Sequence, residues 1–261
     1  MISAAASSRT SELPYVPTGK LTDLPNGHPC ADCPVRPITI CRGLDAPTLA
    51  GLRALGTMQR LRPEQSVFRE GDPAKRVFMV TLGSLKLYTL LADGRRQITG
   101  FMFPGDFLGV SVDEEYAFTV EALEESELWW FSREAFDRFI REHPQVEREL
   151  YRLAAHELAE AQRQMVLLGR KAAAERLASF FLSLIERAER ASGVSEKSFD
   201  LPMSRIDIAD YLGLTKETVS RMLAHLRSRS LIRLQAQDRV EILDRDGLRS
   251  MALGESAERL G

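Results

Sequence analysis

The protein has 261 residues, of which 44% are hydrophobic, and a formal net charge of −2. This length exceeds one small domain and suits two modest domains with real cores. The near-neutral charge excludes a chain that is basic throughout, so any nucleic-acid-binding surface must be local. The first residues are rich in Ser, Ala and Pro and hold no long apolar run, which predicts a disordered tail over residues 1–27 rather than a signal peptide or a membrane span. Three cysteines is an odd number, which argues against a disulfide framework and favours a reducing, cytoplasmic location.

After the cysteines, the sequence pattern changes from one typical of a helix to one typical of β-strands. Residues 46–63 predict a short helix that ends before Pro63. From residue 66 to residue 131, apolar and β-branched residues come in short runs separated by glycines, which predicts an antiparallel β-barrel or jelly roll. Asp93-Gly94 predicts a tight hairpin turn inside it. Together with the cysteine segment, this region is expected to form a sensory domain over residues 28–143.

A long helix is predicted over residues 144–170, followed by a second helix over residues 172–190. The apolar residues of the long helix step by three or four and lie between charged flanks, which favours a coiled-coil seam between two copies of the chain. The alternative is a helix that packs only on its own domain. The predicted seam consists of Tyr151, Ala154, Leu158, Ala161, Met165 and Leu168.

Residues 171–250 are predicted to form a winged helix-turn-helix domain after a polar loop. Ser204 and Asp207 suit the capping of a first helix, Gly213 suits a tight turn, and Thr215 suits the cap of a second helix. The segments LIRL and RVEIL are expected to pair as a wing around QAQD. The positions expected to face inward are Ile206, Ile208, Ala209 and Leu212 on the first helix, and Val219, Met222, Leu223 and Leu226 on the second.

The outer face of the second helix carries polar and basic side chains. Arg221 can donate two hydrogen bonds to guanine O6 and N7, and Glu217 can accept one from the cytosine N4 amino group. Phosphates repel a carboxylate, so Glu217 on this face favours base readout. The alternative is a solvated helix surface without a partner. The candidate contacts to double-stranded DNA are Thr215, Lys216, Glu217, Ser220, Arg221 and Arg205.

Three segments carry a resemblance to a known family: LGLTKETVSRML, ITGFMFPGDFLG and RKAAAERLASFFLSL. They resemble the CRP/FNR superfamily of bacterial transcription regulators, in its FNR/FixK-type branch, over roughly residues 28–245. The resemblance implies an α+β protein: an antiparallel β-barrel of the cyclic-nucleotide-binding type, a long dimerisation helix and a C-terminal winged helix-turn-helix. It also implies a homodimer that is no enzyme, binds palindromes of the type TTGA-N-TCAA, contacts RNA polymerase and activates genes responsive to oxygen or redox state.

The stretch EEYAFTVEA matches the place where the cyclic-nucleotide-binding branch of this superfamily holds its phosphate with an Arg-Ser pair. Tyr116 and Ala117 stand at those two positions. Neither side chain can neutralise a cyclic phosphate, and burial of an unpaired phosphate is costly. We therefore expect that cAMP is not the effector.

The spacing Cys30-x2-Cys33-x7-Cys41 resembles the N-terminal ligand set of FNR-like oxygen sensors, which hold a [4Fe–4S] cluster. The internal fourth cysteine of those sensors is missing here, since Trp129 stands in its place. A cluster on this chain needs another fourth ligand: His28, Asp32, Asp113, Glu114 or an exogenous group.

Several alternatives to the cluster stay open at this stage. One is a FixK-like regulator without a cofactor, controlled by its abundance, by partner proteins or by thiol oxidation; another is a zinc site on the same thiols. Haem is not expected, because the four histidines are scattered along the chain. An iron–sulfur electron carrier or enzyme conflicts with the complete DNA-reading motif, and a cyclic-nucleotide-binding module is disfavoured by Tyr116.

Overall fold

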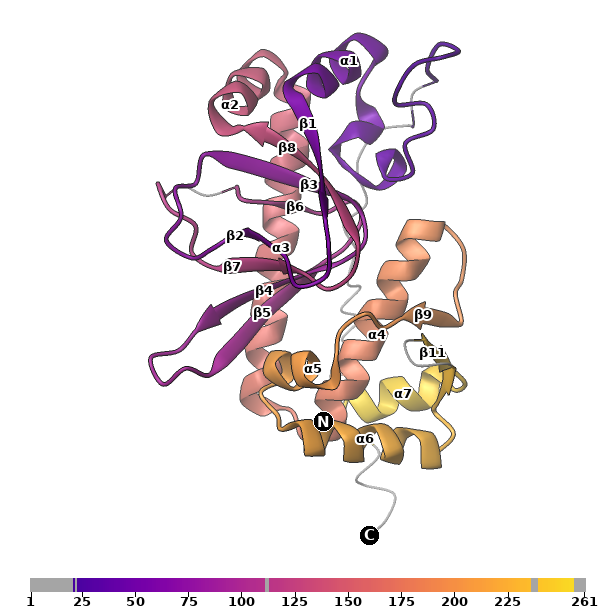
Figure 1. The fold of residues 1–261 in the computed structure, drawn as a ribbon. Coiled ribbons are helices and arrows are strands. Elements are labelled where there is room, and N and C mark those ends of the chain that lie inside the picture. The colour runs from indigo at the N-terminus through magenta and orange to yellow at the C-terminus, as the bar shows by residue number, and fades with distance from the viewer. Residues whose placement is uncertain (1–20, 22, 111–112, 236–238, 256–261) are drawn as a thin grey trace, which may run out of the picture.

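The computed structural model describes residues 21, 23–110, 113–235 and 239–255. Most of the tail expected over residues 1–27 lies outside them. A β-sheet domain and a helical C-terminal domain lie one above the other, and the long helix α3 (Pro144–Arg170) runs alongside both (Figure 1). Within the described residues, no helix is both long and apolar enough to cross a membrane.

The N-terminal domain contains two four-stranded antiparallel sheets. The first has the order β1 (Gly56–Leu61), β8 (Ser126–Ser132), β3 (Arg76–Leu82), β6 (Phe107–Leu108), and the second has the order β2 (Ser66–Phe68), β7 (Thr119–Ala122), β4 (Leu85–Leu90), β5 (Arg96–Met102). Buried side chains from both sheets, among them Phe78, Leu85, Val120 and Leu128, form one apolar core. This confirms the predicted jelly-roll-type β domain, although the strands described pair as two sheets and not as one closed barrel.

The predicted hairpin at Asp93-Gly94 joins β4 to β5. Gly94 has φ +84°, and the amide of Leu91 donates to the carbonyl of Arg95 at 2.8 Å. A glycine adopts this left-handed conformation without a steric penalty. The two strands then pair from end to end, with one register shift between Leu87 and Tyr88.

The helix predicted over residues 46–63 is shorter than expected. Helix α1 spans Ala46–Leu55, with Asp45 as its N-cap, and β1 begins directly at Gly56. Strand β1 pairs residue by residue with β8, so tertiary pairing overrides the local helical pattern. Gly56 permits this close approach, since a Cβ atom there would lie 2.6 Å from the Trp129 ring.

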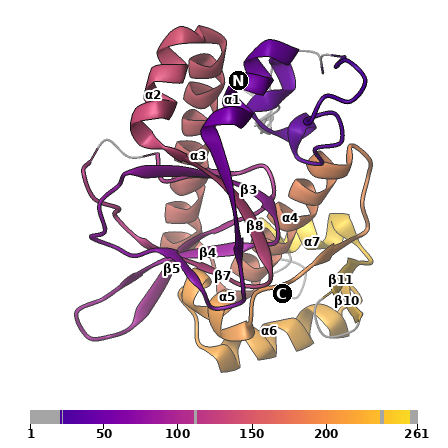
Figure 2. The same cartoon turned by 45° about the horizontal axis from the view of Figure 1, so that its top comes forward.

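Three helices follow the last strand of the β domain in the chain. Helix α2 (Arg133–Glu142) leads through His143 into α3, and α4 (Ala173–Ser192) follows α3 after two non-helical residues. The cysteine segment forms two short 3-10 helices, η1 (Arg36–Ile38) and η2 (Ile40–Gly43). It lies beside α1, at the end of the β domain that α1 and α2 cover (Figure 2).

The C-terminal domain adds α5 (Arg205–Leu212), α6 (Lys216–Ser228), α7 (Arg245–Ala252) and a three-stranded sheet of order β10 (Ile232–Gln235), β11 (Arg239–Ile242), β9 (Ser198–Asp200). The predicted wing is confirmed as the β10–β11 pair, whose connecting residues 236–238 lie outside the described part of the chain. Strand β9 lies inside the predicted polar loop, where it completes the sheet against β11.

Gly83, in the turn between β3 and β4, offers a test of the packing within the β domain. It has φ +79°, and a Cβ atom there would lie 2.5 Å from the carbonyl oxygen of Glu125. We expect Gly83→Ala to lower the free energy of unfolding by roughly 2 kcal/mol or more, since strain in φ and a backbone clash add together. Gly94→Ala is the control: φ is +84°, but nothing lies within 4 Å of its Cβ position. Equal losses in denaturant unfolding would contradict the predicted clash.

Candidate DNA-binding interface

Helix α5 begins at a capping box. The amide of Asp207 donates to Ser204 Oγ at 3.1 Å, and the amide of Ser204 donates to Asp207 Oδ2 at 3.1 Å. These reciprocal bonds satisfy amides that would otherwise lack a partner at the helix start. The predicted cap is therefore present, and it holds Asp207 almost fully buried at 5% exposure.

A tight turn connects α5 to α6. Gly213 caps α5 with φ +61°, a left-handed conformation that favours glycine. Two residues later Thr215 Oγ1 accepts from the amide of Thr218 at 3.2 Å and starts α6. The chain thus changes direction between the two helices within three residues, as in a helix-turn-helix.

The inner faces of the two helices mostly match the prediction. Ile208, Ala209, Leu212, Val219, Leu223 and Leu226 are buried, and Met222 packs against the same core. Ile206 is the exception: it is 49% exposed. Ile206 lies in the first turn of α5. In that turn the side chain of Asp207 faces inward, so the neighbouring Ile206 faces outward.

The candidate DNA contacts come together on one outer face of α6. Lys216, Glu217 and Arg221 are exposed, and Ser220 is half-buried. Arg205 of α5 joins this face, because its Nη1 donates to Ser220 Oγ at 3.4 Å. Helix α6 lies at the end of the molecule away from the two sheets of the N-terminal domain, so that domain of the same chain does not cover it (Figure 1).

Arg176 of α4 supports the turn and was not found from the sequence. Its Nη1 donates to the carbonyl of Leu212 at 2.8 Å, its Nη2 to that of Leu168 at 2.8 Å, and its Nε to that of Lys171 at 2.8 Å. One guanidinium therefore ties the end of α3, the start of α4 and the end of α5 together. No local pattern signals this role, since all three accepting groups are backbone carbonyls, which leave no mark in the sequence, and that of Leu212 is 36 residues away.

The predicted seam on α3 is largely an exposed apolar stripe. Tyr151 is 77%, Leu158 61% and Met165 71% exposed, and Ala154 and Ala161 between them are exposed as well. Leu168, the last predicted seam residue, is partly buried and packs against the core of the C-terminal domain. In the single chain the stripe is thus open for about four turns and ends where α3 meets that domain.

The three cysteines share one apolar cluster. Cys41 is buried, and Cys30 and Cys33 are half-buried against the same core. Burial raises the pKa of the Cys41 thiol to about 11. Burial also raises the pKa of Cys30, although the Arg53 charge and hydrogen bond oppose it. Both shifts favour the neutral thiol over the thiolate.

The remaining candidate ligands do not complete a metal site here. His28 Nδ1 accepts from the amide of Cys30 at 3.1 Å, so its Nε2 must donate to the carbonyl of Ala46 at 3.1 Å, and neither nitrogen is left for a metal. Trp129, at the place of the missing cysteine, packs on the cysteine cluster under the Arg53 guanidinium, 4.8 Å from its ring centre. Among the described residues, no three His, Cys, Asp or Glu side chains are arranged to hold a metal ion. In this conformation the donor set does not fit a [4Fe–4S] cluster.

Tyr116 fills the interior of the β domain. Its ring stacks on Phe68 with 3.6 Å between ring centres, and its hydroxyl donates to the carbonyl of Arg76 at 2.7 Å. The side chain is 5% exposed. The first of the two positions matched in the sequence analysis to a phosphate-binding Arg-Ser pair therefore holds a packed, hydrogen-bonded phenol.

Comparison with known proteins agrees with both domains. A family model described as a cyclic nucleotide-binding domain matches residues 58–143, and one described as a Crp-like helix-turn-helix domain matches residues 175–251. The chain is 44% identical to the nitrogen fixation regulation protein FixK of Bradyrhizobium diazoefficiens over 80% of this chain and 87% of that protein. It is 36% identical to the transcriptional activator protein anr of Pseudomonas aeruginosa over 91% and 98%.

A solved structure supports the same placement. FixK2 from Bradyrhizobium japonicum superposes with a TM-score of 0.70 and 35% sequence identity, over 75% of this chain and 96% of that one. These relatives are transcription regulators and not enzymes, and a DNA-binding helix-turn-helix is common to this chain and to them. The chain belongs to the CRP/FNR family of transcription regulators, in its FNR/FixK branch.

Proposed function

We propose that the protein is a homodimeric transcription activator that places α6 of each protomer in the major groove of a TTGA-N-TCAA-type palindrome. The observation that carries the proposal is the single outer face of α6 that presents Glu217, Ser220 and Arg221. A helix of this kind fits the major groove and reads base edges with its exposed side chains. Lys216, Thr215 and Arg205 border the same face and suit phosphate contacts.

The apolar stripe on α3 supports the dimer. An exposed line of Tyr151, Leu158 and Met165, with small alanines between them, matches the seam of a two-stranded coiled coil. A second copy of α3 that packs there buries the stripe and gives the two α6 helices a two-fold relationship. Two-fold symmetry of the protein is what a palindromic site requires.

We further propose that the dimer binds DNA without a resident cofactor, in the manner of a FixK-like regulator whose abundance sets its activity. His28 uses both ring nitrogens in hydrogen bonds, and Trp129 stands where a fourth cysteine is expected, so the described conformation supports the alternative without a cluster. The packed Tyr116 argues against cAMP, and the scattered histidines argue against haem. Contact with RNA polymerase and control of genes responsive to oxygen or redox state follow from the family resemblance.

Arg221→Ala tests base readout. Loss of a bidentate guanine contact costs about 1–3 kcal/mol on the matching half-site, while weak salt-sensitive binding to any duplex survives. The measurement is DNA affinity on the palindrome and on sequences altered at the guanine, at several salt concentrations. Lys216→Ala, at an exposed position on α6 that suits a phosphate contact, is the control and should lower affinity similarly on all sequences. Equal loss on every sequence for Arg221→Ala would contradict base readout.

Ala161→Asp tests the seam. It places two carboxylates across the dimer axis, which costs of order 1 kcal/mol or more and weakens dimerisation by about tenfold. Sedimentation equilibrium measures the dissociation constant. Ala155→Asp makes the same chemical change at an exposed position beside the stripe, and we expect it to leave the dimer intact. An unchanged constant for Ala161→Asp shows that the seam lies elsewhere.

Metal content tests the absence of a cofactor. We expect anaerobically purified protein to contain iron, sulfide and zinc well below one atom per chain, because the thiols and His28 are not arranged as ligands. Its DNA affinity should match that of a Cys33→Ser variant. A brown protein whose iron and sulfide disappear in Cys33→Ser overturns this part of the proposal and establishes the cluster expected from the cysteine spacing.

A further inference from the structure

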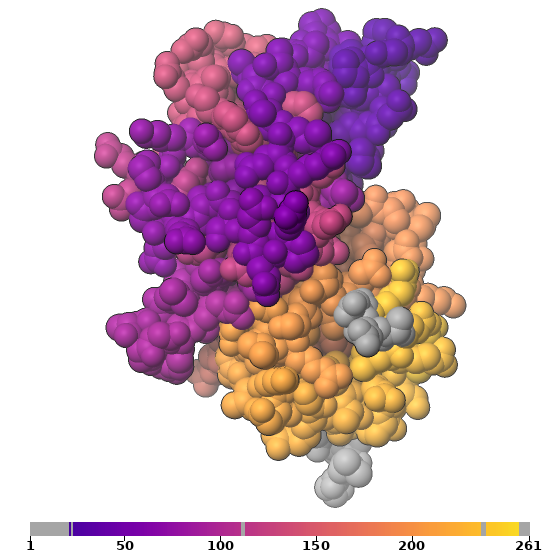
Figure 3. All heavy atoms as spheres, viewed as in Figure 1, coloured from indigo at the N-terminus to yellow at the C-terminus, as the bar shows by residue number. Residues whose placement is uncertain are grey.

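The β domain and the C-terminal domain meet along a continuous contact (Figure 3). Its centre is aromatic: Phe101 of β5 lies 5.9 Å from Phe180 of α4 and 5.1 Å from Tyr211 of α5, measured between ring centres. Ile98 of β5 is buried in the same cluster as the core of the C-terminal domain. Apolar burial is strong but non-directional, so it holds the domains together without fixing their rotation.

A buried cluster of charged side chains beside these rings (Lys86, Arg96, Glu121 and Asp207) fixes how the two domains are oriented. Lys86 of β4 is 7% exposed, and its Nζ lies 2.8 Å from Glu121 Oε1 of β7 and 3.3 Å from Asp207 Oδ1 of α5. The ammonium group therefore sits between a carboxylate of its own sheet and one of the DNA-binding domain. Removal of one partner from such a buried pair leaves a charge without compensation, which is costly.

Arg96 of β5 binds the same turn of α5 at two points. Its Nη2 lies 2.7 Å from Asp207 Oδ1, and its Nε donates to Asp210 Oδ2 at 2.9 Å. The neighbouring Gln97 Nε2 donates to the carbonyl of Asp210 at 2.6 Å. Two carboxylates three residues apart on one helix face thus meet one planar guanidinium, a geometry that fixes orientation as well as distance.

Asp207 connects this cluster to the DNA-reading motif. Burial opposes its ionisation, but the Ser204 hydrogen bonds and the Lys86 and Arg96 charges prevail and hold the pKa of the carboxyl below its ordinary value. The same carboxylate closes the capping box of α5. The charge cluster therefore holds the first turn of α5, and α5 is the helix that directly precedes α6 in the helix-turn-helix.

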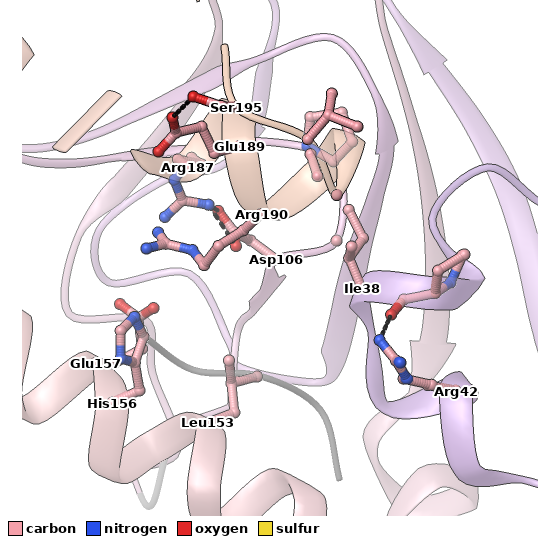
Figure 4. Close-up of a pocket in the computed structure, with 16 residues that line it drawn as sticks. Ile38, Arg42, Asp106, Leu153, His156, Glu157, Arg187, Glu189, Arg190 and Ser195 are labelled. Carbon is pink, nitrogen blue, oxygen red and sulfur yellow. Dashed lines mark hydrogen bonds and ion pairs between the residues drawn. The ribbon is translucent and has the colours of Figure 1, made fainter. Parts of the chain in front are cut away.

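A second ionic contact joins the domains at α4. Arg187 Nη1 lies 2.8 Å from Asp106 Oδ1 and 2.7 Å from Oδ2, on the loop between β5 and β6. This pair lines a pocket of about 450 Å³ that also contains Ile38 of η1 and His156 of α3 (Figure 4). Contacts on two different helices, α4 and α5, resist rotation better than either alone.

The covalent link between the domains is short and non-helical. Lys171 caps α3 in an extended conformation, and Ala172 is extended before α4 begins. Backbone rotation at these two residues changes the direction in which α6 points relative to α3. The orientation of α6 is therefore set by tertiary contacts and not by helix continuity: Arg176 holds the link itself, and the interface holds α4 and α5 against the β domain.

We propose that Arg96 and Lys86 are positioning residues for DNA reading: by holding α5 against the β domain they fix the separation of the two recognition helices in the dimer. The inference rests on the proposed binding of a dimer to a palindrome, and it names the residues that set the distance between the two α6 helices. Neither residue touches DNA in this arrangement, since both lie in the domain interface. Their expected effect is on the spacing between half-sites that the dimer accepts.

The test uses the full chain, Arg96→Glu, and a set of palindromes whose half-sites are moved apart or together by one and two base pairs. Wild-type protein should prefer one spacing, and Arg96→Glu should lower that preference by about tenfold, the effect of about 1.4 kcal/mol. Affinity for a single half-site should stay the same. Arg95→Glu is the matched control, because Arg95 is exposed and pairs with Asp93 within its own hairpin turn.

A charge exchange and a milder variant complete the experiment. Arg96→Glu combined with Asp210→Arg should restore part of the spacing preference, because it re-forms one of the two Arg96 pairs with reversed charges while the Asp207 carboxylate stays unchanged. A merely structural defect would not be restored by reversed charges. Arg96→Gln gives the same readout if Arg96→Glu fails to fold, as judged by circular dichroism. Unchanged spacing preference in a folded Arg96 variant overturns the proposal, and so does higher affinity at every spacing. Failure of the wild-type protein on all palindromes would instead overturn the proposed function.

Discussion

The packing of the sheet β2-β7-β4-β5 onto α4 and α5 is the constraint on which the rest of the molecule depends. Phe101 extends the hydrophobic core of the C-terminal domain into the β domain, and Lys86 and Arg96 join the two across the same boundary. Because this boundary is both apolar and charged, it gives the two domains a defined relationship. The helix-turn-helix is thereby held as part of a larger body and not as a tethered module.

Most of the DNA-reading motif could be predicted because its determinants are local. The Ser204–Asp207 cap, the left-handed Gly213 and the Thr215 cap each act within three residues, and the structure contains all three. The hairpin at Gly94 belongs to the same class. Short-range hydrogen bonds and backbone conformation leave a readable pattern in the sequence.

The features that were missed depend on partners far along the chain. Residues 56–61 carry a helical pattern but pair with β8, and Ile206 is exposed because Asp207 turns inward to meet Lys86 and Arg96. Leu168 continues the stripe of α3 in the sequence, yet the C-terminal domain covers it. The cysteine spacing alone likewise gives no information on the contacts that His28 and Trp129 make in the folded chain. Periodicity cannot report any of these contacts.

The open stripe on α3 has a consequence for the dose response of such a regulator. If only paired chains occupy a symmetric operator, then at concentrations below the dimer dissociation constant the bound fraction of operator rises with the square of the amount of protein. Doubling the number of chains then produces about a fourfold rise in occupancy at low saturation. For a regulator whose activity follows its own concentration, dimerisation through the apolar stripe makes operator occupancy rise more steeply with concentration. A higher affinity of a monomer for DNA would shift the response to lower concentration without making it steeper.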